Sequence, residues 1–150
     1  MTRRAIVAAN WKMNGDLTLV NTMIAGLANV DLQENVDVVI CPSAIYLSNM
    51  VNQLKESNLS AAFNVGSQNV SEHDSGAYTG EVSPPMLKDV GCEWVIIGHS
   101  ERRQYHEESD ELIAAKVKAA VAASLNPIVC VGETQQQRED GEAQFVVAKQ

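Results

Sequence analysis

Five short apolar runs at a nearly constant interval constrain the fold of this 150-residue chain more than any other feature. The steps between the valine or isoleucine residues near their centres are 32, 26, 31 and 33 residues. Each run is almost continuously apolar, which is typical of strands covered on both faces of a parallel sheet. The pattern therefore predicts a repeated βα unit. The five runs are 5–10, 36–41, 61–68, 93–100 and 127–133.

Helical patterns lie between these runs. Apolar residues recur every three or four positions across 17–30 and 112–125. Ser109 precedes the second pattern as a candidate N-cap, and Ser83 before two prolines indicates the start of a shorter helix. The last residues, 144–150, form a further helical pattern without a stop signal.

Two α/β architectures fit this repeat: an open doubly wound sheet and a (β/α)8 barrel, or TIM barrel. A barrel of roughly 250 residues has eight such units at about this spacing. Five strands are predicted here. We therefore interpret residues 1–150 as the N-terminal portion of a single TIM-barrel domain, present as a partial barrel of five parallel strands.

The charge and the cysteines narrow the class of protein. The net charge of −8 argues against nucleic acid or an anionic membrane as a partner, because both need a basic surface. No apolar stretch has the length of a signal peptide core or a transmembrane helix. Cys41, Cys92 and Cys130 are far apart and odd in number, which indicates reduced thiols in a cytoplasmic protein.

Polar residues follow four of the five predicted strands at their carboxyl ends. Parallel α/β folds build their functional sites at that edge of the sheet, so these residues are candidates for one shared site. For the polar residues that follow the third and fifth strands, Gln68 and Glu133, we favour a structural role. The residues are Asn10 and Lys12 after the first strand, Gln68 after the third, His99, Ser100 and Glu101 after the fourth, and Glu133 after the fifth.

Ordinary structural roles remain open for each of these residues. Lys12 alone would be a solvated lysine, and Asn10 would cap the turn after the first strand. His99 would be a core histidine that donates to a backbone carbonyl, with Ser100 capping a short helix. The segment 101–103 would be a solvated charged loop.

Motifs for other chemistries are missing. The sequence has no G-x-G-x-x-G, P-loop, H-E-x-x-H or G-x-S-x-G motif. His73, His99 and His106 do not fall at metal-ligand spacings, and no P-C-x-x-C follows "HSE". We expect neither a cofactor nor a metal.

Four segments, taken together and in order, resemble the triosephosphate isomerase family: AANWKMNG (8–15), GAYTGE (76–81), VIIGHSERR (95–103) and PIVCVGE (127–133). The resemblance implies a (β/α)8 barrel enzyme of glycolysis and gluconeogenesis that uses no cofactor. Such an enzyme interconverts dihydroxyacetone phosphate and glyceraldehyde 3-phosphate through an enediolate. The substrate is a small anionic triose phosphate.

The resemblance also implies roles for individual residues. His99 is the electrophile and works as a neutral imidazole, which is a known property of the family and not a deduction from this sequence. Lys12 supplies fixed positive charge, and Asn10 is a donor to the substrate. Glu101 orders the site beside them, and Arg102 supports the loop by local pairing. Supporting roles are expected for Ser100, Gln68, Cys130 and Glu133.

The GAYTGE segment (76–81) matches a long third loop that in the family reaches into a neighbouring subunit. Gly76, Tyr78 and Thr79 would then lie at a homodimer interface, with Thr79 near the partner's Asn10 and Glu101. A glycine-bounded surface turn is the alternative reading of the same residues.

Some parts of the family's site have no counterpart in these residues. In the family the catalytic base follows a sixth strand, the closing lid follows the base, and amides after the seventh and eighth strands hold the phosphate. Glu101 and Glu133 do not correspond to that base. We therefore expect the native chain to continue past Gln150 and the 150-residue fragment alone to be inactive.

Two other functions remain open. A non-catalytic half-barrel that binds or assembles with a partner would leave its first and fifth strands as open edges. Its barrel-filling side chains would also face water. Another sugar-phosphate barrel enzyme, such as an epimerase, suits the fold and the acidic pI. It does not explain NWK (10–12) together with GHSERR (98–103).

Overall fold

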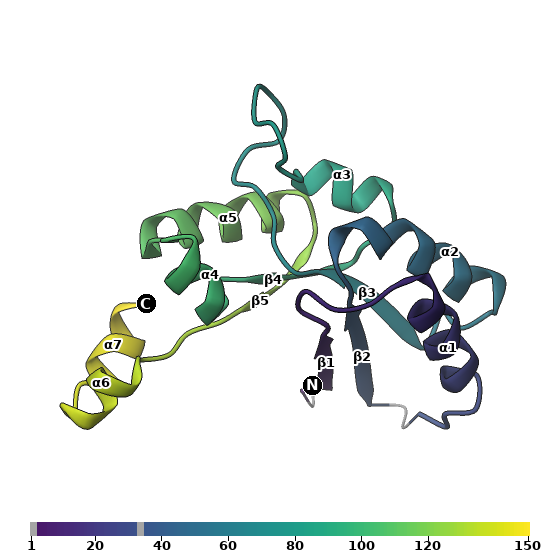
Figure 1. Cartoon of the computed structure of the whole chain (residues 1–150), viewed down its shortest axis with the longest axis horizontal. Coiled ribbons are helices and arrows are strands. Elements are labelled where there is room, and N and C mark those ends of the chain that lie inside the picture. The colour runs from purple at the N-terminus through teal and green to yellow at the C-terminus, as the bar shows by residue number, and fades with distance from the viewer. Residues whose placement is uncertain (1–2, 33–34) are drawn as a thin grey trace.

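A computed structural model describes residues 3–32 and 35–150 and shows one curved parallel sheet with helices along one side (Figure 1). The strands are β1 Ala5–Asn10, β2 Val36–Cys41, β3 Phe63–Ser67, β4 Trp94–Ile97 and β5 Asn126–Val129. The helices are α1 Leu17–Leu27, the 3-10 helix η1 Ala44–Tyr46, α2 Leu47–Glu56, α3 Pro84–Asp89, α4 Ser100–Tyr105, α5 Asp110–Ala122, α6 Gln135–Glu139 and α7 Ala143–Lys149.

The strands follow one another across the sheet in chain order, β1 to β5, and every neighbouring pair is parallel. This confirms the predicted partial barrel of five parallel strands. Each predicted apolar run contains a strand, although three of the runs extend beyond it. The run that ends at Ser100 is cut short at Ile97, because Gly98 has a φ of +74° and turns the chain out of the extended conformation.

The helix ends follow their capping residues. Ser83 accepts a hydrogen bond from Met86 N–H at the start of α3, and Ser109 accepts one from Leu112 N–H at the start of α5. Both serines are the N-caps expected from the sequence. Helix α2 was not predicted as a separate element, yet it supplies four buried apolar residues: Leu47, Met50, Val51 and Leu54.

The main core lies between the helices and one face of the sheet. Alternate residues of each strand point to opposite faces, so Ile40 and Val95 pack against the helices while Val39 and Ile96 belong to a smaller cluster on the other face. Helices α1, α2, α3 and α5 contribute buried side chains to the main core. They are Val20 and Ile24 of α1, Leu47, Met50, Val51 and Leu54 of α2, Leu87 of α3, and Ile113 and Ala120 of α5.

The expectation that every strand is covered on both faces is wrong for β1. Ile6 is 51% exposed and Val7 is 56% exposed. Strand β1 is at one edge of the sheet and pairs with β2 alone, so fewer neighbours surround its side chains. Strand β5 is at the other edge, where Val129 is 44% exposed.

Cys41 and Cys92 are buried and Cys130 is partly buried, and all three are free thiols. Burial raises the pKa of Cys41 to about 12 and the pKa of Cys92 to about 11, so both are unreactive at neutral pH. Among the helices of the described residues, none combines the length and apolarity needed to cross a bilayer.

A buried ion cluster joins the segment after α4 to α5. The carboxylate of Glu108, 3% exposed, accepts hydrogen bonds from Arg102 Nε at 2.6 Å and Lys116 Nζ at 2.5 Å. Lys116 also donates to Asn69 Oδ1 at 3.0 Å, which links α5 to the loop after β3. Burial alone would raise the pKa of Glu108, but the bonds from Lys116 and Arg102 outweigh burial and leave that pKa lowered.

The lowered pKa of Glu108 predicts a loss of stability in acid. The stabilisation is complete above the ordinary glutamate pKa of about 4.3 and is lost as the pH falls through the lower folded-state value, because the unfolded chain binds the proton first. Glu108→Gln should cost about 1–3 kcal/mol at neutral pH and flatten this acid dependence. Urea unfolding of the native protein across pH 3–7 measures both effects.

The control for this measurement is Glu56→Gln, because Glu56 is exposed at the end of α2. It should keep the stability and the acid dependence of the unsubstituted protein. An acid dependence that is equally steep in Glu108→Gln would show that this carboxylate is not the titrating group.

Candidate active site

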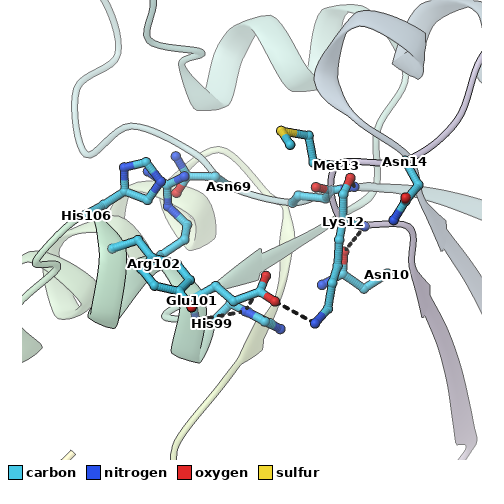
Figure 2. A pocket seen from close by; sticks show the side chains of 11 residues that line it. Asn10, Lys12, Met13, Asn14, Asn69, His99, Glu101, Arg102 and His106 are labelled. Carbon is cyan, nitrogen blue, oxygen red and sulfur yellow. Dashed lines mark hydrogen bonds and ion pairs between the residues drawn. The ribbon is translucent and has the colours of Figure 1, made fainter.

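Loops after three strands converge on a cavity of about 550 Å3 at the carboxyl edge of the sheet (Figure 2). Because parallel strands end at the same edge, residues from β1, β3 and β4 meet there although they are far apart in sequence. The cavity is lined by Asn10, Lys12, Met13, Asn14, Gln68, Asn69, His99, Glu101, Arg102, Tyr105 and His106.

Lys12 occupies a strained backbone conformation that three hydrogen bonds hold in place. Its φ is +53°, in the left-handed region that lysine rarely adopts. Its N–H donates to Asn10 Oδ1 at 2.9 Å, and its carbonyl accepts bonds from Gln68 Nε2 at 2.9 Å and Ser43 Oγ at 3.1 Å. Strain of this kind persists only where the surroundings determine the conformation, and it is concentrated at functional sites.

Gln68 ties the loop of Lys12 to the neighbouring strand end. Besides its bond to the Lys12 carbonyl, Gln68 Nε2 donates to the carbonyl of Cys41 at 2.8 Å. One side-chain amide therefore connects the ends of β1, β2 and β3. Gln68 therefore holds the backbone of Lys12 through a hydrogen bond from its side-chain amide, a contact that agrees with the supporting role expected for it.

His99 is the N-cap of α4. Its Nδ1 accepts the backbone N–H of Glu101 at 3.2 Å (Figure 2). Because Nδ1 is the acceptor in this hydrogen bond, Nε2 is the ring nitrogen left to donate into the cavity. The sequence interpretation in which Ser100 caps the short helix is wrong. Ser100 is the first residue of α4, and the imidazole of His99 caps the helix instead.

Glu101 contacts both Lys12, in the loop after β1, and His99, at the start of α4. Its Oε1 accepts a hydrogen bond from Lys12 Nζ at 2.6 Å, and its Oε2 lies 3.5 Å from His99 Nδ1 (Figure 2). The hydrogen bond from Lys12 holds the pKa of Glu101 below its ordinary value, so its carboxylate is charged at neutral pH. Glu101 therefore neutralises Lys12 and positions its ammonium group.

The groups in this cavity suit a small anion with a carbonyl group. The ammonium group of Lys12 is held by Glu101 on a fixed backbone, and Nε2 of His99 is left as a donor. Donors aimed at a developing negative charge stabilise oxyanion transition states. Across residues 3–32 and 35–150, no three His, Cys, Asp or Glu side chains gather as ligands of a metal ion would.

The polar residues of the fifth strand do not line this cavity. Cys130 is partly buried beside the end of β4, where its N–H donates to the Ile97 carbonyl at 2.9 Å and burial raises the pKa of its thiol. Glu133 forms an ion pair with Arg138, the fourth residue of α6. Their supporting roles remain predictions.

The segment that holds Gly76, Tyr78 and Thr79 projects from the body of the molecule between β3 and α3 (Figure 1). All three residues are exposed. The ring of Tyr78 stacks on that of His73 with centroids 3.9 Å apart and planes 8° apart, so the loop is ordered by its own side chains. None of the three lines the cavity within this chain.

Five residues that line the cavity were not predicted as site residues. Met13 and Asn14 follow Lys12 in the same loop, and Asn69 follows Gln68. Tyr105 is the last residue of α4 and His106 is its C-cap, so both are at the opposite end of this helix from His99. Met13, Asn14 and Asn69 could have been predicted from the sequence, because each is close in the chain to a predicted site residue. Tyr105 and His106 could not, because they reach the cavity only through the orientation of α4.

Comparisons with known proteins agree with this geometry. A family model described as triosephosphate isomerase matches residues 5–150. A protein named triosephosphate isomerase from Colwellia psychrerythraea is 56% identical over 150 residues, which are 100% of this chain and 59% of the relative. Proteins of the same name from Alkalilimnicola ehrlichii and Vibrio cholerae are 50% and 47% identical over 99% of this chain and 58% and 57% of their own lengths.

The chain thus spans a little under three fifths of the length of the curated relatives it matches. The match nevertheless runs through every strand and through each of the three loops that form the cavity. On this match, the chain belongs to the triosephosphate isomerase family.

Proposed function

We propose that the native protein interconverts dihydroxyacetone phosphate and glyceraldehyde 3-phosphate through an enediolate. The observation that carries this proposal is the convergence of Lys12, His99 and Asn10 on one cavity, with Nδ1 of His99 bound to the N–H of Glu101. The family membership of the chain supports it, because relatives that match the whole chain are named triosephosphate isomerase. We place the protein in the cytoplasm and in glycolysis.

His99 would polarise the substrate carbonyl and move protons between the two oxygens. Its Nε2–H is a weak acid, so its strength is matched to that of an enediol hydroxyl, and proton transfer is easiest between groups of similar pKa. Nδ1 is held by the N–H of Glu101, so the donor nitrogen does not change during the reaction.

Lys12 would hold the anionic substrate and the charge that develops on the enediolate. Its ammonium group is bound to Glu101 at 2.6 Å. A triose phosphate would compete for the same ammonium group, while Glu101 keeps the side chain extended toward the cavity. Asn10 is bound to the N–H of Lys12 and would maintain the loop geometry beside the substrate.

Glu101 is a poor candidate for the base that removes the carbon-bound proton. Its carboxylate is bound to Lys12 and its pKa is lowered, and a lower pKa makes a weaker base. We therefore assign Glu101 to positioning and charge balance, and we do not assign the base to any residue of this cavity.

We propose a homodimer as the active form. Met13 is 95% exposed beside the cavity, and the ordered loop that carries Tyr78 and Thr79 projects into solvent. An exposed methionine and a protruding aromatic loop are typical of surfaces covered by a partner. Thr79 of one subunit would lie near Asn10 and Glu101 of the other.

His99→Gln should reduce kcat by about 10²–10⁴-fold, the range expected when a proton-transfer group is removed. KM should change little, because glutamine keeps a donor of similar size. A coupled assay of triose phosphate interconversion measures both constants, and thermal unfolding checks that the fold is retained. A kcat close to that of the unsubstituted protein would refute the role of His99.

Lys12→Met should raise KM and lower kcat together, each by roughly tenfold or more, because an ammonium bound to an anion contributes in both the ground and transition states. The matched control is Lys118→Met, because Lys118 is exposed on α5 and does not line the cavity. It should leave both constants unchanged. Equal kinetics for the two variants would remove Lys12 from the mechanism.

Sedimentation equilibrium of the native protein should give twice the mass of one chain. Met13→Asp should weaken this association, because it places a charge in a surface that we expect to be buried between subunits. A monomeric native protein with full activity would contradict the dimer proposal.

A further inference from the structure

We propose that Arg103 is a positioning residue for His99: its side chain and its backbone N–H together hold the two peptide carbonyls on either side of the imidazole residue. Arg103 is absent from the described lining of the cavity, so it would act through His99 and not on the substrate. The kinetic consequence of this inference rests on the proposed function, whereas its effect on the His99 ring does not.

The paired part of the sheet ends just before His99. The last residues in register between β4 and β5 are Ile97 and Val129, and Cys130 N–H donates to the Ile97 carbonyl at 2.9 Å. The next carbonyls, those of Gly98 and Cys130, lie beyond the paired strands. Carbonyl groups at such a position need another donor, because leaving them unpaired in a partly buried site costs free energy.

Arg103 supplies that donor to both strands. Its Nε donates to the Gly98 carbonyl at 2.8 Å, and its Nη2 donates to the Cys130 carbonyl at 3.1 Å. The guanidinium is planar and presents its N–H groups in a fixed fork, so one side chain can replace the missing step between β4 and β5. The end of β4 is thereby tied to the end of β5.

The guanidinium is itself fixed from the other side. Its Nη1 lies 2.6 Å from Asp110 Oδ1, and the Arg103 side chain is 17% exposed. Asp110 is the first residue of α5, where the helix dipole favours a negative charge. Arg103 therefore connects β4, β5 and α5, and a partly buried ion pair restricts its rotation.

These contacts bear directly on the backbone of His99. Arg103 N–H donates to the His99 carbonyl at 3.1 Å, and Arg103 Nε binds the Gly98 carbonyl that precedes His99. The Gly98 carbonyl and the His99 nitrogen belong to one planar peptide, so holding the oxygen holds the plane from which the His99 side chain departs. The Arg103 side chain thus holds the peptide before His99, and the Arg103 N–H shares the His99 carbonyl with the N–H of Arg102, which donates at 2.8 Å.

Gly98 makes this restraint necessary. Its φ of +74° is in the region that favours glycine, which is the most flexible residue in a chain. A Cβ at this position would meet the Cys130 carbonyl oxygen and the Ile113 side chain at 3.2 Å, so another residue here would be crowded as well as strained. A flexible residue immediately before the electrophile needs an external contact to define where the ring lies.

The three charged residues after Ser100 have separate partners. Glu101 binds Lys12 in the cavity, Arg102 binds Glu108 beneath it, and Arg103 binds the strand ends. Their side-chain contacts do not overlap, so the Arg103 side chain can be changed without removing a partner of Glu101 or of Glu108.

The test compares Arg103→Gln, Arg103→Lys and a control in the native protein. Arg103→Gln should lower kcat by about tenfold or more with KM changed by less than about twofold, because misplacing a catalytic group slows the reaction more than it weakens binding. Arg103→Lys keeps the charge near Asp110 but lacks the fork, so its kcat should be intermediate. The control, Arg4→Gln, removes an arginine paired with Asp37 at 2.9 Å beside the opposite end of the sheet and should leave both constants unchanged.

The deciding readout is the pair of ¹⁵N signals of the His99 ring, assigned by their loss in His99→Gln. They should shift or broaden in Arg103→Gln, and to a smaller extent in Arg103→Lys. Ring signals that match those of the unsubstituted protein would overturn the proposal, whatever the kinetics. Altered ring signals with an unchanged kcat would support the positioning role and contradict the proposed function instead.

If Arg103→Gln does not fold, Arg103→Lys carries the test alone. Unchanged His99 signals in that variant, together with kcat and KM equal to those of the unsubstituted protein, would overturn the proposal.

Discussion

The hydrogen bond from the N–H of Glu101 to Nδ1 of His99 is the contact on which the rest of the site depends. It begins α4, because the imidazole takes the place of the usual capping hydroxyl. It makes Nδ1 an acceptor and leaves Nε2 as the donor. It also places the Glu101 side chain where it can bind Lys12, so one backbone bond organises His99 and Lys12 together.

The scaffold around that bond consists largely of side chains that hold backbone carbonyls. Gln68 holds the carbonyls of Lys12 and Cys41, and Arg103 holds those of Gly98 and Cys130. The carbonyls of Lys12, Gly98 and Cys130 lie beyond the paired strands, where the ladder no longer pairs them, whereas the Cys41 carbonyl also accepts the N–H of Trp11 at 3.0 Å. The chain therefore extends the order of the sheet into the loops, which is where a parallel α/β fold builds its site.

The apolar runs predicted the number, order and direction of the strands, because that information is local and periodic. The apolar run of β1 alone suggested a strand covered on both faces, which is wrong, whereas the open first edge expected of a five-stranded sheet agrees with the exposure of Ile6 and Val7. His99 as an N-cap was missed because serine is the commoner cap. The contacts of Gln68 and Arg103 were missed because both join strand ends that are distant in sequence.

The central claim is that a triose phosphate binds at the carboxyl edge of β1, β3 and β4. The most direct measurement is a crystal structure of the native protein with a non-reactive triose phosphate analogue that carries a carboxylate in place of the enediolate. The account predicts Lys12 Nζ and His99 Nε2 within hydrogen-bond distance of the analogue, with His99 Nδ1 still bound to Glu101 N–H. An analogue bound elsewhere, or bound in the cavity without contact to either side chain, would contradict it.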